Sequence, residues 1–303
     1  MSTGLVDLHT HFFGPAFFRT LAAAAHPEGN PRPGFARLAA AGVEVPKGDA
    51  RDHARRWLAE MDRHGIDHMV SFASIPEEAE SVAEGVAASN GRLTTFSLID
   101  PTAPGIVPRV RELTDTLGTR GLLLFPAMHR FNLSDPALDP FYREVESKRL
   151  PLIVHMGTLQ VRVRDLLELP SDFDLNYATP ERLVGVVERF PEIRFIIPHF
   201  GGGYLEETLS LGSQFANVAM DTSSSNSWIQ RQPGDLTLTR VFARALEVFG
   251  AERIYFGTDS SVFPRGWRRD LYETQSAALD ELGISRADRE RILGGNTLAL
   301  LEG

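Results

Sequence analysis

The chain has no cysteine among its 303 residues, and it has very little lysine, with Lys47 and Lys148 as the two examples. The absence of cysteine excludes disulfide bonds, thiolate metal sites and a cysteine nucleophile. No run reaches the roughly 18 apolar residues that a membrane-spanning helix needs. No basic start or apolar segment of a secretory signal precedes the first strand-like run. We therefore expect a cytoplasmic protein without membrane partners.

Acidic residues outnumber basic residues, and the formal net charge is −9 at pH 7. Nucleic-acid binding normally draws its affinity from a basic surface, so this balance argues against a nucleic-acid partner. A small anionic substrate stays open, since one local arginine can outweigh the overall sign. Hydrophobic residues make up 43% of the chain and charged residues 23%, which is enough for a sizeable core.

Eight short apolar runs rich in strand-forming residues are each followed by a helical pattern. Near-continuous apolar runs are typical of strands that are buried on both faces. Eightfold alternation of strand and helix predicts an α/β fold, the (β/α)8 TIM barrel, as one domain over residues 1–303. The alternative is an open doubly wound sheet, which fits the count of eight and the length less well. The predicted strands are 4–10, 67–74, 93–100, 120–127, 150–156, 193–200, 217–223 and 253–259.

The connections between these elements are uneven in length. A long insert rich in glycine, proline and aromatic residues spans 12–50, and further long connections span 157–178, 223–238 and 260–268. All four leave the carboxyl ends of predicted strands, which is the face where barrel active sites are built. The 12–50 insert could serve as a lid or as the interface of a homodimer.

Five polar side chains stand at the carboxyl ends of otherwise apolar strands: His9, His11, His155, His199 and Asp259. The first two flank one residue in a strand, so both side chains point to the same face. Burial of such groups is costly unless each finds a partner, and a metal ion supplies one. Imidazole with carboxylate suits zinc, with manganese as the alternative. The pattern predicts a metal site at the barrel mouth.

Four further residues are candidates for contact with the substrate. Arg265 lies on the turn after strand 8 and could hold a carboxylate through two hydrogen bonds. His129 follows strand 4 on the same face, while Phe13 and Trp228 lie on the loops after strands 1 and 7. Aromatic side chains on such loops pack a lid as often as they touch a ligand.

The other histidines are interpreted as structural. His26, His53, His64 and His68 fall on predicted loop or helix surfaces, or at the beginning of a strand.

The site motifs resemble those of the amidohydrolase superfamily. The chain is most similar to the amidohydrolase-related branch that includes aminocarboxymuconate-semialdehyde decarboxylase. The matching segments lie between residues 6 and 300 in the order of that family: VDLHTHFFG, LPLIVHMG, RFPEIRFIIPHFGGG, VAMDTSS, RIYFGTDS and GGNTLALL.

The resemblance implies a role for each of the five strand-end residues. His9, His11 and His155 would ligate the metal, and Asp259 would be the fourth ligand and could also accept a proton. His199 would stay off the metal and act as general acid and base beside a bound water.

Two departures qualify the resemblance. Binuclear members use a carboxylated lysine on strand 4, where this chain has none, so one divalent metal is expected. Branch decarboxylases usually follow the strand-8 aspartate with a Tyr-Pro-like turn, whereas this chain continues SSVFPRGW after Asp259.

The leading hypothesis is a metal-dependent hydrolase that uses activated water on a small carboxylate-bearing substrate. The alternative is non-oxidative decarboxylation of an unsaturated or aromatic acid, since the branch contains both reactions on nearly the same residues. A catalytically silent ligand-binding barrel is a second alternative, and the complete ligand set argues against it.

Overall fold

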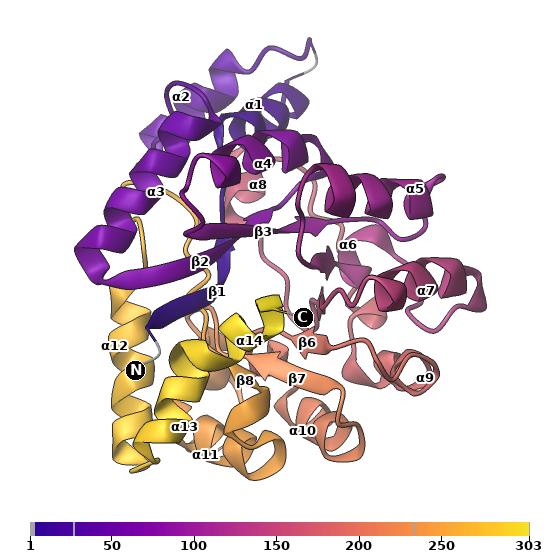
Figure 1. The fold of residues 1–303 in the computed structure, drawn as a ribbon. Helices are drawn as coiled ribbons and strands as arrows, with labels where there is room; N and C mark the ends of the chain where they lie inside the picture. The colour runs from indigo at the N-terminus through magenta and orange to yellow at the C-terminus, as the bar shows by residue number, and fades with distance from the viewer. Residues whose placement is uncertain (1–3, 27, 233, 303) are drawn as a thin grey trace.

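Eight parallel strands form a single sheet in the order β1 to β8, with helices between them (Figure 1). The computed structural model describes residues 4–26, 28–232 and 234–302. The strands are β1 (Leu5–His11), β2 (Ile66–Ala73), β3 (Leu93–Leu98), β4 (Leu122–Leu124), β5 (Leu152–Val154), β6 (Phe195–Ile197), β7 (Val218–Asp221) and β8 (Ile254–Tyr255). The predicted strands are confirmed, although the last six, β3 to β8, are shorter than predicted.

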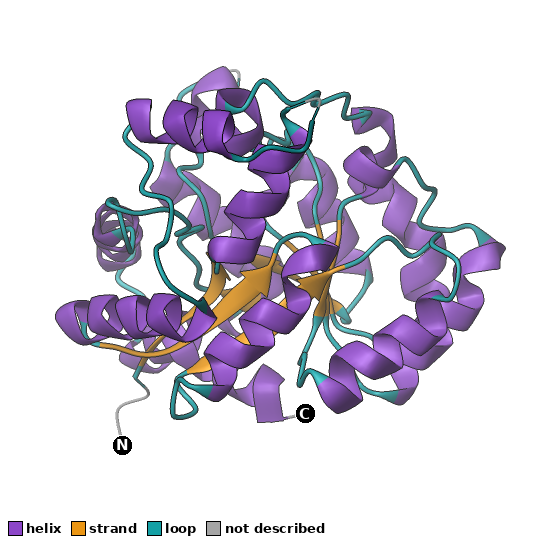
Figure 2. Cartoon of the chain, turned by 90° about the horizontal axis from the view of Figure 1, so that it is seen from above, coloured by secondary structure: helices purple, strands orange, loops and turns teal. Residues whose placement is uncertain are grey.

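Helices surround the strands, as the view from above shows (Figure 2). They are α1 (Pro15–Ala24), α2 (Arg32–Ala40), α3 (Ala50–His64), α4 (Ala79–Ala87), α5 (Ile106–Arg111), α6 (Pro126–His129), α7 (Asp139–Ser147), α8 (Arg162–Leu166), α9 (Val184–Arg189), α10 (Leu205–Gln214), α11 (Leu238–Phe249), α12 (Arg269–Glu281), α13 (Arg286–Glu290) and α14 (Asn296–Glu302). In the described part of the chain, no helix has the length and apolar character needed to cross a membrane.

The sheet closes on itself through the chain that follows β8. The amide of Leu8 donates to the carbonyl of Phe256 at 2.9 Å, and the amide of Asp259 donates to the carbonyl of His9 at 2.8 Å. These bonds leave the strands without a free edge. The barrel prediction is therefore confirmed, and the open-sheet alternative is excluded.

A β-bulge in β1 decides which side chains enter the barrel. Between the pairs Asp7↔Met69 and Thr10↔Ser71, β1 advances three residues while β2 advances two. An extra residue of this kind re-aims side chains. Leu8 joins the apolar cluster inside the barrel, and the next residue, His9, lines the cavity above it.

Two apolar layers hold the barrel together. The interior layer takes side chains from the inner face of every strand, with Leu300 and Leu301 of α14 packed against it. The second and larger layer lies between the strands and the surrounding helices. The interior layer consists of Leu8, Val70, Phe72, Phe96, Leu98, Leu123, Ile153, Ile196, Ala219 and Tyr255.

Helix α3 shows how local sequence signals place an element. Its first turn is held by a capping box, in which Asp49 and Asp52 each accept a bond from the other's amide. It ends at Gly65, whose φ of 65° suits glycine and turns the chain directly into β2.

The interpretation of His53 as a surface residue was wrong. Its side chain lies on the buried face of α3, where its Nε2 lies 2.7 Å from the carbonyl of Phe12. The ring is buried because α3 packs over the loop that follows β1.

The 12–50 insert folds into α1 and α2 and packs against the loop after β5. Phe17 and Leu21 of α1 and Leu38 of α2 form one buried cluster with Val163 and Leu167. The insert thus lies over the carboxyl ends of the strands, next to the predicted site.

Candidate metal and active site

The five strand-end side chains meet at one cavity of about 370 Å³ at the carboxyl ends of the strands. His9, His11, His155, His199 and Asp259 all line it. A larger and more open groove of about 770 Å³ lies between α2 and α3, but it contains none of these residues. We take the smaller cavity as the candidate active site because the ionisable groups converge there.

His9, His11 and Asp259 form a group of the size that a metal ion requires. One ligand atom from each lies within 4.8 Å of the others. Nε2 of His11 is 3.0 Å from Oδ1 of Asp259, and Nε2 of His9 is 3.9 Å from the same oxygen. Two imidazole nitrogens and a carboxylate oxygen are ligands that suit zinc or manganese. The residues present therefore fit one divalent metal.

His155 faces the same cavity from the end of β5, although it lies outside that tight group. Its ring stacks on Phe125 at 5.0 Å between centroids and lies 5.2 Å from the ring of His199. Its Nδ1 is buried without a hydrogen-bond partner among the described residues. Burial lowers the pKa of His155 well below its usual value, so the ring is neutral and can act as a ligand.

Asp221 is a site residue that the sequence interpretation missed. It ends β7, is fully buried, and places Oδ2 2.8 Å from Nδ1 of His9. Burial would raise the pKa of Asp221, but the charge and hydrogen bond of His9 hold it at about 2. A carboxylate behind a ligating imidazole fixes the orientation of the ring. The sequence could have indicated Asp221, because it is an acidic residue at the end of an apolar strand, as Asp259 is.

A second set of possible metal ligands includes His9, but its contacts are those of a hydrogen-bond network rather than of a metal site. His9, His199 and Asp221 also offer ligand atoms within 4.8 Å of one another. Asp221 has no exposed surface and does not line the cavity, so a metal there could not reach a substrate. Its oxygens already accept bonds from Ser223 and from the amide of His199.

His11 is oriented by the loop that follows β2. Its Nδ1 lies 2.7 Å from the hydroxyl of Ser74. The same loop is tied to the start of α1 by Glu78, which accepts bonds from the amides of Gly14 at 2.7 Å and Ser74 at 3.0 Å. Burial raises the pKa of Glu78 to about 8. These contacts hold the mouth of the barrel on the β1–β2 side.

His199 and Asp259 both adopt the left-handed backbone conformation, with φ of 58° and 59°. This region is unfavourable for residues with a side chain, and strain of this kind concentrates at functional sites. Burial is the main cause that lowers the pKa of His199, which favours the neutral ring. Its Nδ1 lies 2.8 Å from the hydroxyl of Ser223.

Three of the four predicted substrate contacts lie at the cavity. Phe13, His129 and Arg265 line it. Phe13 stacks on Phe17 with 3.8 Å between ring centroids, and Nδ1 of His129 is buried with no partner in the described chain. Trp228 does not line the cavity. Its ring packs into the outer apolar layer and its indole donates to Asn226 at 3.1 Å, so the side chain is held away from the cavity.

The turn after Asp259 is anchored to β1, and this anchor brings its arginines to the cavity. The indole of Trp267 donates to Oδ2 of Asp7 at 2.8 Å. Arg265 and Arg268 precede and follow this anchor, and both line the cavity. Arg268 is paired with Asp270, whereas among the described residues the one hydrogen-bond partner of Arg265 is the hydroxyl of Ser261, at 3.0 Å.

Arg162 was not predicted, and it lines the cavity from the first turn of α8. It makes no hydrogen bond or ion pair within the described ranges. It therefore adds a second guanidinium without a carboxylate partner to the cavity mouth. The sequence did not single out Arg162, because an arginine in a long loop cannot be told from one that is simply solvated.

We expect Gly257→Ala to disturb the site directly. A Cβ at Gly257 would lie 2.7 Å from Cβ of His9 and 3.0 Å from Cβ of Ser223. Overpacking of this kind costs roughly 1–3 kcal/mol. Calorimetric unfolding should show the loss, and zinc titration should show weaker binding. Gly185→Ala on α9 is the control, because its Cβ would meet the side chains of Ser134 and Arg189, which lie outside the cavity. Unchanged stability and zinc affinity would contradict the packing described here.

Comparison with known families gives one match over nearly the whole chain. The family model described as amidohydrolase matches residues 6–303.

Solved structures with the same fold include both hydrolases and decarboxylases. The 5-carboxyvanillate decarboxylase from Sphingomonas paucimobilis is 16% identical with a TM-score of 0.68, over 99% of each chain. A probable 2-pyrone-4,6-dicarboxylic acid hydrolase from Acinetobacter baumannii, solved with citric acid, is 16% identical with a TM-score of 0.62, over 99% of this chain and all of that one. A dihydroxybenzoic acid decarboxylase from Polaromonas sp. JS666, solved with manganese and 2-nitroresorcinol, is 19% identical with a TM-score of 0.62, over 99% and 97% of the two chains.

Proposed function

The chain belongs to the amidohydrolase family, and from this premise we propose that it is a metal-dependent hydrolase of a small carboxylate-bearing substrate. The observation that carries the proposal is the group formed by His9, His11 and Asp259, with the unligated His199 beside it in one cavity. A bound divalent metal, zinc or alternatively manganese, would polarise the substrate and lower the pKa of a water to about 7.

Each site residue has a role in this proposal. His9, His11, His155 and Asp259 hold the metal, and the buried Asp221 orients His9 through Nδ1. His199 accepts a proton from the attacking water and returns it to the leaving group. Oδ1 of Asp259 lies 3.0 Å from Nε2 of His11, which places both ligand atoms beside the same metal position.

The wall of the cavity supports a flat, apolar substrate with an acid group. Phe13, Phe125 and Leu98 line it, and so do Arg162 and Arg265, neither of which forms an ion pair with a described carboxylate. A guanidinium binds a carboxylate through two parallel hydrogen bonds, which fixes the orientation of the acid. The apolar side chains would hold the body of the molecule.

We expect Arg265→Gln to weaken substrate binding. Loss of a charged hydrogen-bond donor costs about 1.5–3 kcal/mol, which corresponds to a roughly 10- to 150-fold rise in KM for the acid substrate. Steady-state kinetics would measure it. Arg269→Gln is the matched control, since Arg269 is exposed and paired with Glu273 outside the cavity. Equal KM values for the two variants would remove Arg265 from the substrate site.

A second candidate function is non-oxidative decarboxylation of an aromatic or unsaturated acid. Two of the three similar structures reported above are decarboxylases, and the aromatic lining with unpaired arginines suits an aromatic acid equally well. In that reaction His199 would supply the proton that replaces the carboxylate.

One assay separates the candidates. Zinc-loaded and manganese-loaded protein is offered a panel of carboxylated lactones, including the pyrone dicarboxylate, and a panel of hydroxylated aromatic acids. Acid release from a lactone without CO₂ is the expected result. CO₂ release without lactone opening would replace hydrolysis with decarboxylation. Metal-loaded protein that turns over neither panel would favour the silent ligand-binding barrel.

The lid and the homodimer remain proposals. Phe17, Leu21 and Val43 of the 12–50 insert form part of the cavity wall, which supports a role as a cover for the substrate. Sedimentation equilibrium would test the dimer, and a monomeric mass would end that suggestion.

A further inference from the structure

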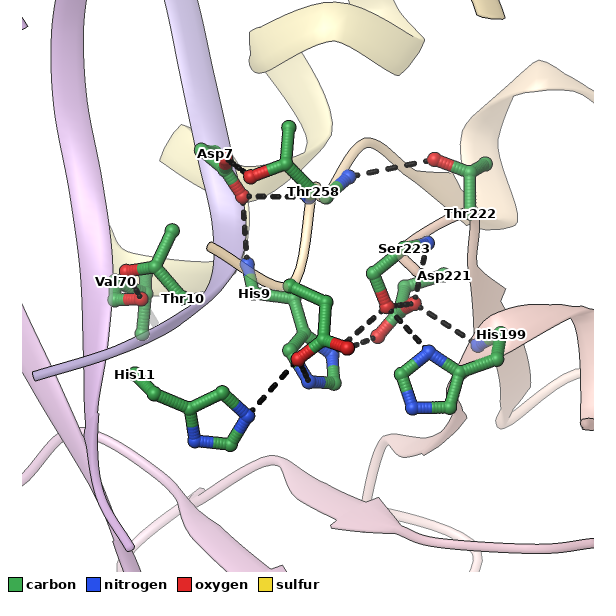
Figure 3. A network of polar contacts seen from close by, with 12 residues as sticks. Asp7, His9, Thr10, His11, Val70, His199, Asp221, Thr222, Ser223 and Thr258 are labelled. Carbon is green, nitrogen blue, oxygen red and sulfur yellow. Dashed lines mark hydrogen bonds and ion pairs between the residues drawn. The ribbon is translucent and has the colours of Figure 1, made fainter. Parts of the chain in front are cut away.

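Ser223 occupies the centre of a buried polar network behind the cavity (Figure 3). Its side chain has no exposed surface and lies two residues beyond the end of β7. Its hydroxyl oxygen is 2.8 Å from Nδ1 of His199 and 3.0 Å from Nδ1 of His9, and it donates to Oδ1 of Asp221. One hydroxyl therefore touches a proposed metal ligand, the proposed proton-transfer residue and the carboxylate between them.

Asp221 is the acceptor that fixes the direction of these bonds. It accepts from the amides of Ser223 at 2.9 Å and His199 at 3.1 Å, in addition to the Ser223 hydroxyl and the ring of His9. Four donors aimed at one carboxylate favour its ionised form. An ionised carboxylate has no proton to give, so every bond to Asp221 must be donated by its partner.

The remaining protons follow by counting. The single hydroxyl proton of Ser223 and the Nδ1 proton of His9 both go to Asp221, so the Ser223 oxygen is left to accept from His199. The contact of 2.8 Å to His199 then requires a proton on Nδ1 of His199. In a neutral imidazole, a proton on Nδ1 leaves Nε2 with a free lone pair.

We propose that Ser223 is a positioning residue that fixes His199 in the Nδ1–H tautomer, with its Nε2 lone pair available to the cavity. The proposal rests on the function proposed above and goes beyond it, because it gives the direction of the first proton transfer. His199 begins the reaction cycle as a proton acceptor. Asp221 fixes His9 in the same tautomer, so one carboxylate orients both rings.

This tautomer of His199 favours hydrolysis over decarboxylation. A base with a free lone pair can take a proton from water at once. A decarboxylase must instead protonate carbon, so it would have to load His199 with a second proton before that step.

Nitrogen NMR of the zinc-loaded full-length protein tests the proposal without any substrate. Histidine labelled with ¹⁵N shows directly which ring nitrogen carries the proton, and a His199→Gln sample identifies the signals of that ring. We expect the wild type to show a protonated Nδ1 and an unprotonated Nε2 at His199. A proton on Nε2 in the wild type would overturn the proposal.

Two variants extend the test. Ser223→Ala removes the acceptor, so His199 should change to the Nε2–H form or to a mixture. Ser225→Ala removes a hydroxyl from an exposed cavity-lining residue and should leave the signals unchanged. An Nδ1–H tautomer that persists in Ser223→Ala would show that Ser223 does not fix the ring.

The outcome is independent of whether the proposed hydrolase activity is found. If a substrate is identified, Ser223→Ala should lower kcat by about 10- to 100-fold at an unchanged KM, as expected for a residue that orients a catalytic group. A rise in KM at unchanged kcat would contradict a positioning role. Failure of all substrates would challenge the proposed function and leave the tautomer measurement standing.

Discussion

His11→Ala is expected to abolish tight metal binding. The Nε2 atom of His11 lies 3.0 Å from Asp259 and is one of three ligand atoms in the tight group at the cavity floor. Loss of an outer partner of a ligand already costs about 10- to 100-fold in affinity, so loss of a ligand itself should exceed that range. Elemental analysis after dialysis should find about one zinc per wild-type chain and only traces in the variant.

Thermal unfolding provides a second measure of the same effect. A ligand present at about 100 times its Kd stabilises the folded state by roughly 2.7 kcal/mol. Added zinc should therefore raise the Tm of the wild type and leave that of His11→Ala unchanged. His68→Ala is the control, because His68 lies near the start of β2 and bonds to Thr94 away from the cavity. Stoichiometric zinc in His11→Ala would show that the metal is bound elsewhere.

His199→Gln is expected to lower kcat by about 100- to 10,000-fold while metal content stays the same. General acid–base catalysis by a placed side chain contributes this range, and glutamine cannot exchange a proton near neutral pH. His199 bonds to Ser223 rather than to Asp259, so its loss leaves the tight ligand group in place. Steady-state kinetics on the substrate found in the panel assay, with elemental analysis of the same sample, would measure both quantities.

His129→Gln is the matched control for that variant. His129 also lines the cavity, and its Nδ1 has no partner in the described chain, but it lies outside the network of Ser223 and Asp221. We expect a change in KM with kcat within a few-fold of the wild type. If His129→Gln lost as much kcat as His199→Gln, the proton-transfer role would have to be assigned again.

The fold could be predicted because the signal is repeated along the chain. Apolar runs such as 150–156 and 193–200 are buried on both faces, and that burial leaves few alternatives to a strand. The outer ends of these runs were overestimated, since β5 ends at Val154 and β6 at Ile197. Beyond those points the chain leaves the sheet to carry His155 and His199 into the cavity.

The outer part of the site could be predicted only in part, because it depends on contacts between distant segments. Ser74 and Ser223 are ordinary serines in the sequence, and only the barrel brings them to Nδ1 of His11 and of His199. Trp228, in contrast, was predicted at the cavity and does not line it. It lies on a loop of the catalytic face, yet its ring packs with the outer apolar layer. Strand-end residues are placed by the sheet, whereas loop residues are placed by packing that the sequence does not display.

The most direct test of the central claim is anomalous diffraction at the zinc edge from crystals of the zinc-loaded protein. The account predicts one peak at the cavity floor, within about 2.0–2.2 Å of nitrogen atoms of His9, His11 and His155 and an oxygen of Asp259. A peak between His9, His199 and Asp221, a second strong peak beside the first, or no peak at the cavity would contradict it.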